Sequence, residues 1–237
     1  MRALLAAILA ILSAPAQSEA DKVEAALRRF GDREYRVFEK GNPVGRCTLK
    51  TRFEGEGGAR LAIFEDRIEK AGDTPQAVTY TEKAALKGLR LRWATRVDGG
   101  ITEDDPRISI EDGNAEVASA QGNLVLNKVE GACGERALIR LICGAEQKVG
   151  SVVTADLLVL DPVDYQRKQQ VKCVAAETLD IGGTKFATFK WVDKREGRSI
   201  LSGEPIPYSF NNAYWVGPDG ALLKFTLGSM EMVLGNK

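Results

Sequence analysis

LRLRWATRVDG (residues 89–99) and RISIEDG (residues 107–113) decide the fold class of this chain. In both stretches apolar residues alternate with charged or polar ones, which is the period of a strand with one buried and one solvated face. The expected dry face carries Leu89, Leu91, Trp93 and Thr95, followed by Ile108 and Ile110. Each stretch ends in Asp-Gly, a pair suited to the positive φ angles of tight hairpin turns. The two stretches therefore predict antiparallel neighbours.

The same period continues outward from these stretches over most of the chain. Further turns are predicted at residues 41–43, at Gly182-Gly183 and at Asp219-Gly220, and an apolar run covers Val152 to Leu160. Roughly a dozen strands result. Parallel neighbours need long crossovers, which these short turns exclude. We therefore expect a mainly β chain whose single curled antiparallel meander forms a half-barrel or a barrel-like shell.

One short helix is expected before the sheet, because Val23, Ala26, Leu27 and Phe30 form an apolar stripe and Gly31 is placed as a stop. Residues 134–150 fit either a strand or a helix, since several apolar residues there follow a helical stripe: Ala137, Leu138, Leu141 and Ile142.

The first 20 residues predict an export signal, with a basic Arg2, an apolar run from Ala3 to Leu12 and small residues after it. That run is too short for a membrane span, which needs about 20 residues. Cleavage fits after Ala16 or after Ala20. Neither site precedes a cysteine, so we expect no lipid anchor. The prediction is a signal peptide at 1–20 and a single antiparallel β domain at 21–237, periplasmic or secreted, without a transmembrane segment.

Four cysteines in a chain predicted to be exported favour two disulfides. The glycines around residues 131–144 favour a local Cys133–Cys143 bridge, which leaves Cys47 with Cys173. The other two pairings stay open, as do reduced cysteines buried as small apolar residues. We expect no metal site, because there is no Cys-x-x-Cys pair and no histidine.

Charge and composition exclude several function classes. The chain has 33 Lys and Arg against 33 Asp and Glu, so no basic field for nucleic acid or anionic lipid is expected. The absence of histidine excludes the common Ser-His-Asp and Cys-His nucleophile pairs. Acid pairs at Asp104-Asp105 and at Asp161 with Asp164 are typical of turns. We expect no catalytic residues and no cofactor.

Aromatic residues on the predicted strands allow two interpretations. They either fill the core or line a hydrophobic pocket on the concave face. The residues concerned are Trp93, Trp191, Trp215, Phe186, Phe189 and Phe225.

The run Tyr35-Arg36-Val37, the turn at 41–45 and the closing YWVGPDGALLK (214–224) resemble uncharacterised exported bacterial β-rich proteins. Their curved sheet is similar to that of periplasmic lipoprotein carriers of the Lol type. The resemblance implies a curved antiparallel sheet and assigns no functional residue.

Three functions follow as hypotheses. The first is a non-enzymatic envelope protein that binds an apolar ligand, such as a lipid or acyl chain, on its curved sheet. The second is a protein–protein interaction module of the envelope with a packed interior. The third is a carboxylate-dependent hydrolase, which needs two facing acids.

Overall fold

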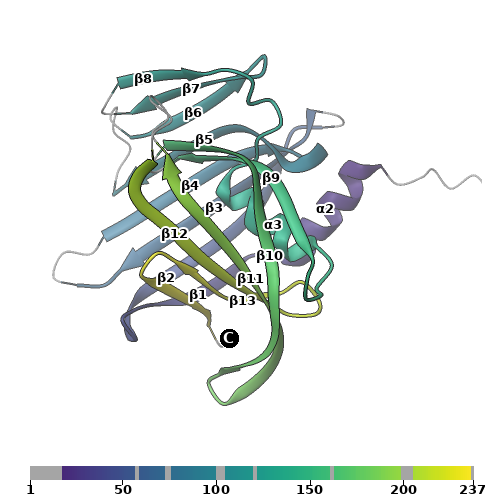
Figure 1. Ribbon diagram of the computed structural model, residues 1–237, viewed down its shortest axis with the longest axis vertical. Helices are drawn as coiled ribbons and strands as arrows, with labels where there is room; N and C mark the ends of the chain where they lie inside the picture. The colour runs from purple at the N-terminus through teal and green to yellow at the C-terminus, as the bar shows by residue number, and fades with distance from the viewer. Residues whose placement is uncertain are drawn as a thin grey trace, which may run out of the picture.

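The computed structural model describes residues 18–56, 59–72, 76–99, 105–119, 122–160, 163–198 and 205–235. Its strands form one 14-stranded antiparallel sheet, in the order β8-β7-β6-β5-β4-β3-β2-β1-β14-β13-β12-β11-β10-β9. Figure 1 shows how this sheet curls. The prediction of a mainly β chain with a curved antiparallel sheet is confirmed, but the sheet is not closed, because β8 and β9 are its two edges.

The sheet consists of two meanders. The first comprises β1 (Arg33–Glu39), β2 (Asn42–Glu54), β3 (Leu61–Lys70), β4 (Gln76–Ala85), β5 (Arg90–Asp98), β6 (Arg107–Glu111), β7 (Asn114–Ser119) and β8 (Gly122–Leu126). The second comprises β9 (Val152–Leu160), β10 (Val163–Ile181), β11 (Thr184–Arg198), β12 (Pro205–Val216), β13 (Leu222–Leu227) and β14 (Met230–Leu234). They are joined by the first and last strands, where Tyr35 pairs with Leu234 and Glu39 with Met230. No sequence signal predicted this seam.

Several predicted turns are confirmed. Asp112 and Gly113 join β6 to β7 with φ angles of 47° and 78°, and Gly182 and Gly183 join β10 to β11 with 59° and 86°. Positive φ at both central residues defines the turn type that matches strand twist, and only glycine adopts it without steric cost.

The predicted dry face of β5 is wrong at Trp93. Lys83 pairs with Trp93 while the next residue, Ala84, pairs with Leu91, so Arg92 is an extra residue in a β-bulge. A bulge reverses the alternation beyond it. Leu91 and Ala94 are consequently both buried, and Trp93 lies on the outer face with the Lys83 ammonium 5.9 Å from its ring centroid.

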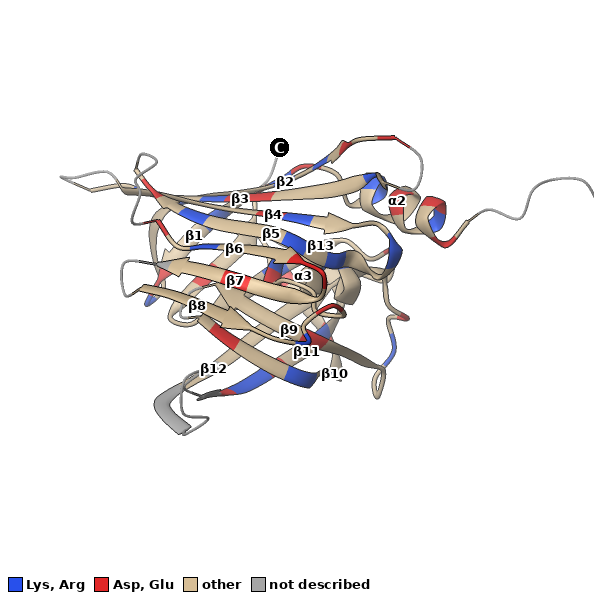
Figure 2. Cartoon of the chain, turned by 90° about the horizontal axis from the view of Figure 1, so that it is seen from above, with Lys and Arg blue, Asp and Glu red and all other residues tan. Residues whose placement is uncertain are grey.

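Two α-helices accompany the sheet. The predicted helix is α2 (Glu19–Phe30), which ends at Gly31 and begins with a capping box between Ser18 and Asp21. The ambiguous segment contains a second helix, α3 (Glu135–Gly144), and a 3₁₀ turn, η2 (Lys87–Leu89), precedes β5. Figures 1 and 2 show α3 between the two layers of strands and α2 at one side. Neither described helix has the length and apolarity needed to span a bilayer.

A strap at residues 129–133 connects β5 of the first meander to the edge strand β9. Ala132 O accepts from Leu91 N of β5 at 2.8 Å. Cys133 N donates to Asp156 O at 2.8 Å and Cys133 O accepts from Leu158 N at 3.0 Å, so the strap pairs with the edge of β9. A small core beneath the strap, which includes Ile108, Val129 and Leu158, is separate from the main core around α3.

Candidate functional site

The concave side of the sheet is filled by α3. Seven of its ten residues are buried, and the set mixes apolar residues with two arginines: Arg136, Ala137, Leu138, Ile139, Arg140, Ile142 and Cys143. Charged positions on α3 therefore lie between the strand layers (Figure 2). Buried arginines are costly unless they are paired, so their partners define the chemistry of this interior.

Asp66 of β3 pairs with both arginines of α3. Its Oδ1 lies 3.1 Å from Arg140 Nη2 and its Oδ2 lies 3.4 Å from Arg136 Nε. Aromatic rings complete the surroundings: the Arg136 guanidinium lies 3.9 Å from the Tyr80 centroid, and that of Arg140 lies 4.9 Å from the centroid of Phe64. One carboxylate thus fixes the helix onto β3.

Glu82 of β4 caps the amino end of α3. Its carboxyl oxygens accept from Arg136 N and Ala137 N at 3.1 Å, which satisfies amides that the helix itself leaves without partners. A Cβ added at Gly134 would lie 2.3 Å from the Glu82 carboxyl carbon, so a larger residue there would displace this carboxyl from the helix amides. Burial raises the pKa of Glu82 to about 7, although Arg136 and the two backbone amides act in the opposite direction.

A second ion-pair group joins α3 to β11. Arg195 Nη2 lies 2.8 Å from Glu135 Oε1, and Arg195 Nε lies 3.0 Å from Asp193 Oδ2. Burial alone would raise the pKa of Glu135, but Arg195 and Arg136 outweigh it and lower that pKa. Burial dominates at Asp193 and raises its pKa.

These two groups form one buried network, which we call the interior ion network. It comprises Asp66, Glu82, Glu135, Asp193, Arg136, Arg140 and Arg195. Four acids face three arginines, so a proton on Glu82 makes the set neutral. This balance agrees with the raised pKa of Glu82. Through α3, the network connects β3 and β4 of the first meander with β11 of the second across the concave side.

The predicted disulfides are wrong: Cys47, Cys133, Cys143 and Cys173 are all buried and free. Cys133 precedes the first turn of α3 and Cys143 lies in its last turn. At about 1.5 Å per residue their Cα atoms are about 15 Å apart, beyond the roughly 7 Å that a bridge permits. Five strands separate β2 from β10 in the sheet, and with them Cys47 from Cys173. Burial raises the pKa of Cys133 and of Cys143 to about 12, so these thiols are protonated.

The predicted acid pairs do not form a described site. Asp164 is buried and accepts from Gln166 Nε2 at 2.7 Å, while its proposed companion Asp161 lies outside the described residues. Asp104 also lies outside them.

The aromatic residues divide between the two faces. Trp191, Phe189 and Phe225 belong to the main core, and Trp191 Nε1 donates to Gln147 Oε1 at 2.9 Å. Trp215 lies on the face opposite its buried neighbour Tyr214, with the Lys190 and Lys224 ammonium groups 5.0 and 4.8 Å from its ring centroid.

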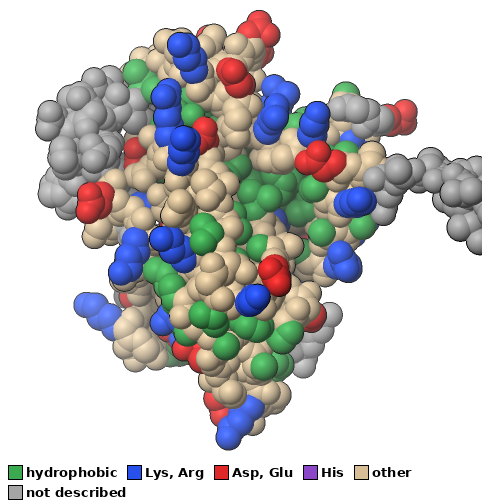
Figure 3. All heavy atoms as spheres, turned by 45° about the vertical axis from the view of Figure 1, so that its right-hand side comes forward, with side chains coloured by type: hydrophobic (Ala, Val, Ile, Leu, Met, Phe, Trp, Pro, Cys, Tyr) green, Lys and Arg blue, Asp and Glu red, His purple; other side chains and the backbone are tan. Residues whose placement is uncertain are grey.

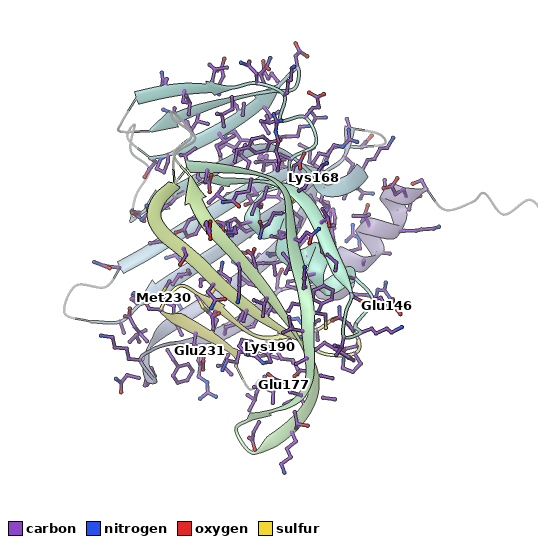
Figure 4. The ribbon with its side chains drawn as sticks, viewed as in Figure 1. Glu146, Lys168, Glu177, Lys190, Met230 and Glu231 are labelled. Carbon is purple, nitrogen blue, oxygen red and sulfur yellow. The ribbon has the colours of Figure 1, made fainter. Side chains whose placement is uncertain are left out.

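Trp215 belongs to an outer-face cluster. Its Nε1 donates to Glu177, and Lys224 pairs with Glu231 at 2.7 Å. Figure 4 shows Glu177, Lys190 and Glu231 in the lower part of the sheet. Two lysines balance two glutamates, and long side chains cover the ring, so this cluster is typical of a solvated sheet face.

The edge strand β8 is the other distinctive feature. Its sequence, GNLVL at Gly122–Leu126, has no charge and no proline, and among the described strands it pairs only with β7. Val125 is 57% exposed, the most exposed large apolar residue described. A hollow of about 410 Å³ lies beside it, lined by outer-face residues of β6–β8 that include Arg107, Ser109 and Glu116.

Sequence reasoning missed the interior ion network, although a signal was present. Arg136 and Arg140 lie four residues apart in a helix that is apolar apart from these two and Glu135, and this spacing places both arginines on one face. Asp66 and Glu82 occupy inward positions of strands whose other inward residues are apolar. Charged residues at the buried positions of two strands and one helix can be expected to pair with one another, because none of them has water as a partner.

Comparison with known proteins supports the fold alone. No family model matches the chain, and no curated protein matches it. A solved β-barrel-like protein of the domain of unknown function DUF1849 from Brucella abortus is similar at a TM-score of 0.54 and 13% identity, over 86% of this chain and 95% of that one. A DUF1089 family protein from Pseudomonas aeruginosa matches at a TM-score of 0.33 and 11% identity, over 75% and 89%. The chain thus has a curved antiparallel sheet similar to that of the barrel-like DUF1849 structure.

Proposed function

We propose that this protein is a non-enzymatic interaction module of the bacterial cell envelope, which docks an extended segment of a partner protein along the edge of β8. The envelope location rests on the predicted export signal. The observation that carries the docking proposal is that, among the described strands, only β7 pairs with β8, whose residues Asn123–Leu126 include neither a charge nor a proline.

Natural sheets usually protect an edge with charges, proline, a bulge or a covering segment. The other edge follows this rule, because the strap at Cys133 pairs with β9 over Asp156–Leu158. β8 has none of the charged or proline residues, and Val125 projects beside a hollow that can receive partner side chains. Main-chain pairing along an edge, with pockets for alternate side chains, is a recurring mode of peptide recognition.

The interior supports this proposal over binding of an apolar ligand. A carrier similar to the Lol type would hold an acyl chain on the concave face. Here α3 and the interior ion network fill that side, and charged groups are poor partners for a hydrocarbon chain. A hydrolase would use two facing acids, but Glu135 and Asp193 share Arg195 as their counter-ion.

Site-specific photo-crosslinking in intact envelopes tests the proposal. A photoreactive residue at Asn123, on the outer side of β8, is expected to give an adduct with a partner protein. V125K, which adds a charge to the edge, is expected to abolish that adduct. A photoreactive residue at Val174 of β10, which is 49% exposed but not on an edge strand, is the matched control.

Equal adducts at Asn123 and Val174, or an adduct at Asn123 that survives V125K, would refute docking at β8. Adducts only between copies of this chain would refute a foreign partner. A co-purifying lipid in native mass spectrometry would instead favour the ligand-carrier hypothesis.

A further inference from the structure

The backbone register of β6–β8 determines which groups the edge of β8 presents. Asp112 and Gly113 form a two-residue turn between β6 and β7, and the residues that close such a turn, Glu111 and Asn114, exchange both backbone hydrogen bonds. Hydrogen-bonded pairs then recur at every second position of an antiparallel ladder. Every second residue of β7, starting from Asn114, thus bonds to β6, and the residues between them bond to β8.

Two residues of β8 consequently turn their backbone toward the edge. The residues of β7 that bond to β8 lie opposite Leu124 and Leu126. Val125, which lies between these two leucines, therefore directs its N–H and C=O away from β7, and so does Asn123. Among the described strands none pairs with β8 on that side. The backbone groups of Asn123 and Val125 are thus placed to bond to an added strand.

The concave side of β8 leaves the small core beneath the strap incompletely covered. Residues of β6 and β7 in this core are almost fully buried, with Ile108 1% and Val117 3% exposed. Leu124 and Leu126 are only half-buried against the same core. Figure 3, in which the β6–β8 end of the molecule is at the top, shows hydrophobic side chains at the surface there between lysine and arginine residues. Residues opposite each other in a ladder point to the same side of the sheet, so apolar residues of an added strand would cover these leucines.

The outer side of β8 favours a different kind of residue. Its outward side chains lie beside the hollow of about 410 Å³. The lining of this hollow includes two small side chains, Ser109 and Ala118, and one charge of each sign, Arg107 and Glu116. These charges sum to zero, so the lining favours neither an acidic nor a basic segment. Hydroxyl side chains suit this side, because they can donate to a carboxylate and accept from a guanidinium.

The two sides of β8 together specify the partner segment. We infer that β8 docks an uncharged extended segment in which apolar residues at alternate positions face the small core and hydroxyl residues between them face the hollow. The apolar residues lie opposite Leu124 and Leu126, and main-chain hydrogen bonds join the segment to Asn123 and Val125. The docked length is that of β8, which has five residues. The inference rests on the docking function proposed above and adds the sequence pattern of the partner to it.

Two peptides of identical composition test this pattern. The alternating peptide is Lys-Thr-Val-Thr-Val-Thr-Val-Thr-Val-Thr-Lys, and its isomer is Lys-Thr-Val-Val-Thr-Thr-Val-Val-Thr-Thr-Lys, in which no two valines are two positions apart. The terminal lysines keep both peptides soluble. Each peptide carries a dye, and fluorescence anisotropy measures its binding to the full chain. The alternating peptide is expected to bind at least about fivefold more tightly, because only this peptide places apolar side chains opposite both leucines.

Two further measurements locate the binding. Amide hydrogen exchange, resolved by residue, is expected to slow at Asn123 and Val125 when the alternating peptide binds, because their N–H groups then have acceptors. The variant L124T is expected to weaken binding of this peptide about fivefold, since it removes apolar surface from the covered side. The matched control is N123T, which changes an outward residue of the same strand and is expected to bind like the wild type.

Equal binding of the two peptides to the wild-type chain overturns the inference. It is also overturned if neither peptide binds, or if exchange slows at other amides and not at Asn123 and Val125. Photo-crosslinking from Asn123 separates this failure from that of the docking function. An adduct that V125K abolishes keeps docking at β8, and the peptide result then removes only the alternating pattern.

Discussion

Glu82 is predicted to make the stability of this protein depend on pH in a direction opposite to that of most carboxylates. Its pKa in the folded protein is raised from 4.5 to about 7 by burial. Between these pH values the folded state keeps the Glu82 proton while the unfolded chain has lost it. Unfolding therefore releases a proton, and the contribution of this group to stability falls as pH rises.

The magnitude follows from the size of the shift. A difference of 4.5 to about 7, at 1.36 kcal/mol per pH unit, gives a loss of about 3 kcal/mol from low pH to neutral pH. The contribution is fully present below about pH 4.5 and is lost once the pH passes about 7. Glu135, whose pKa is lowered, acts in the opposite direction, so the wild-type curve alone does not isolate Glu82.

The difference in unfolding free energy between wild type and E82Q isolates the contribution of Glu82 to the pH dependence. Glutamine resembles the protonated carboxyl and still offers one oxygen to the amides of Arg136 and Ala137. Urea unfolding is measured from about pH 5 to about pH 8, and E82Q is expected to gain stability relative to wild type as pH rises, by about 2 to 3 kcal/mol. E116Q, which alters an exposed carboxylate of β7, is the matched control and is expected to show no such trend.

The reasoning is refuted if the difference between wild type and E82Q is constant over this range. It is also refuted if wild type becomes the more stable protein as pH rises, because that result would mean that Arg136 and the helix amides lower the pKa of Glu82.

Three further predictions concern stability and chemical state. G134A is expected to destabilise the protein by about 2 kcal/mol or more, because its Cβ would displace the Glu82 carboxyl; unfolding in urea measures this, and a cost within about 0.5 kcal/mol would contradict the close packing. All four cysteines are expected to react with a thiol reagent only after unfolding, and mass mapping under non-reducing conditions is expected to find no bridge; one linked peptide would disprove it. If the predicted signal is cleaved, cleavage is expected after Ala16, since cleavage after Ala20 would remove Ser18 and its capping box; sequencing the amino end of the mature chain checks this, and S18A is expected to cost about 1 kcal/mol.

The sequence predicted local structure well. Asp112-Gly113 and Gly182-Gly183 determine turns through the φ angles they adopt, and the stripe ending at Phe30 determines a helix, because each signal lies within a few neighbouring residues. The bulge at Arg92 was not predicted, because the sequence still alternates on both sides of the extra residue. The alternation alone does not show that the residues beyond the bulge face the opposite side of the sheet. The predicted bridges were wrong because the number of cysteines gives no information about the distances between them.

Long-range pairing was beyond the reach of these signals. The contact of Asp66 with Arg140 spans 74 residues, and neither residue alone distinguishes a buried partner from a solvated charge. The pairing of Glu135 with Arg195 likewise needs α3 to lie against β11. Both features would have required knowing which elements become neighbours.

The seam between β1 and β14 has a consequence for the order in which the chain folds. It joins residues about 200 positions apart, such as Tyr35 and Leu234, and closing a loop of that length costs about 5 kcal/mol of chain entropy. β1 precedes its partner strand by almost the whole sheet, so a chain that emerges amino end first exposes β1 as an unpaired edge until β14 follows. Completion of the sheet is therefore a late, slow event. Loss of the final strand would leave two hairpin arrays, each with an open edge prone to aggregation.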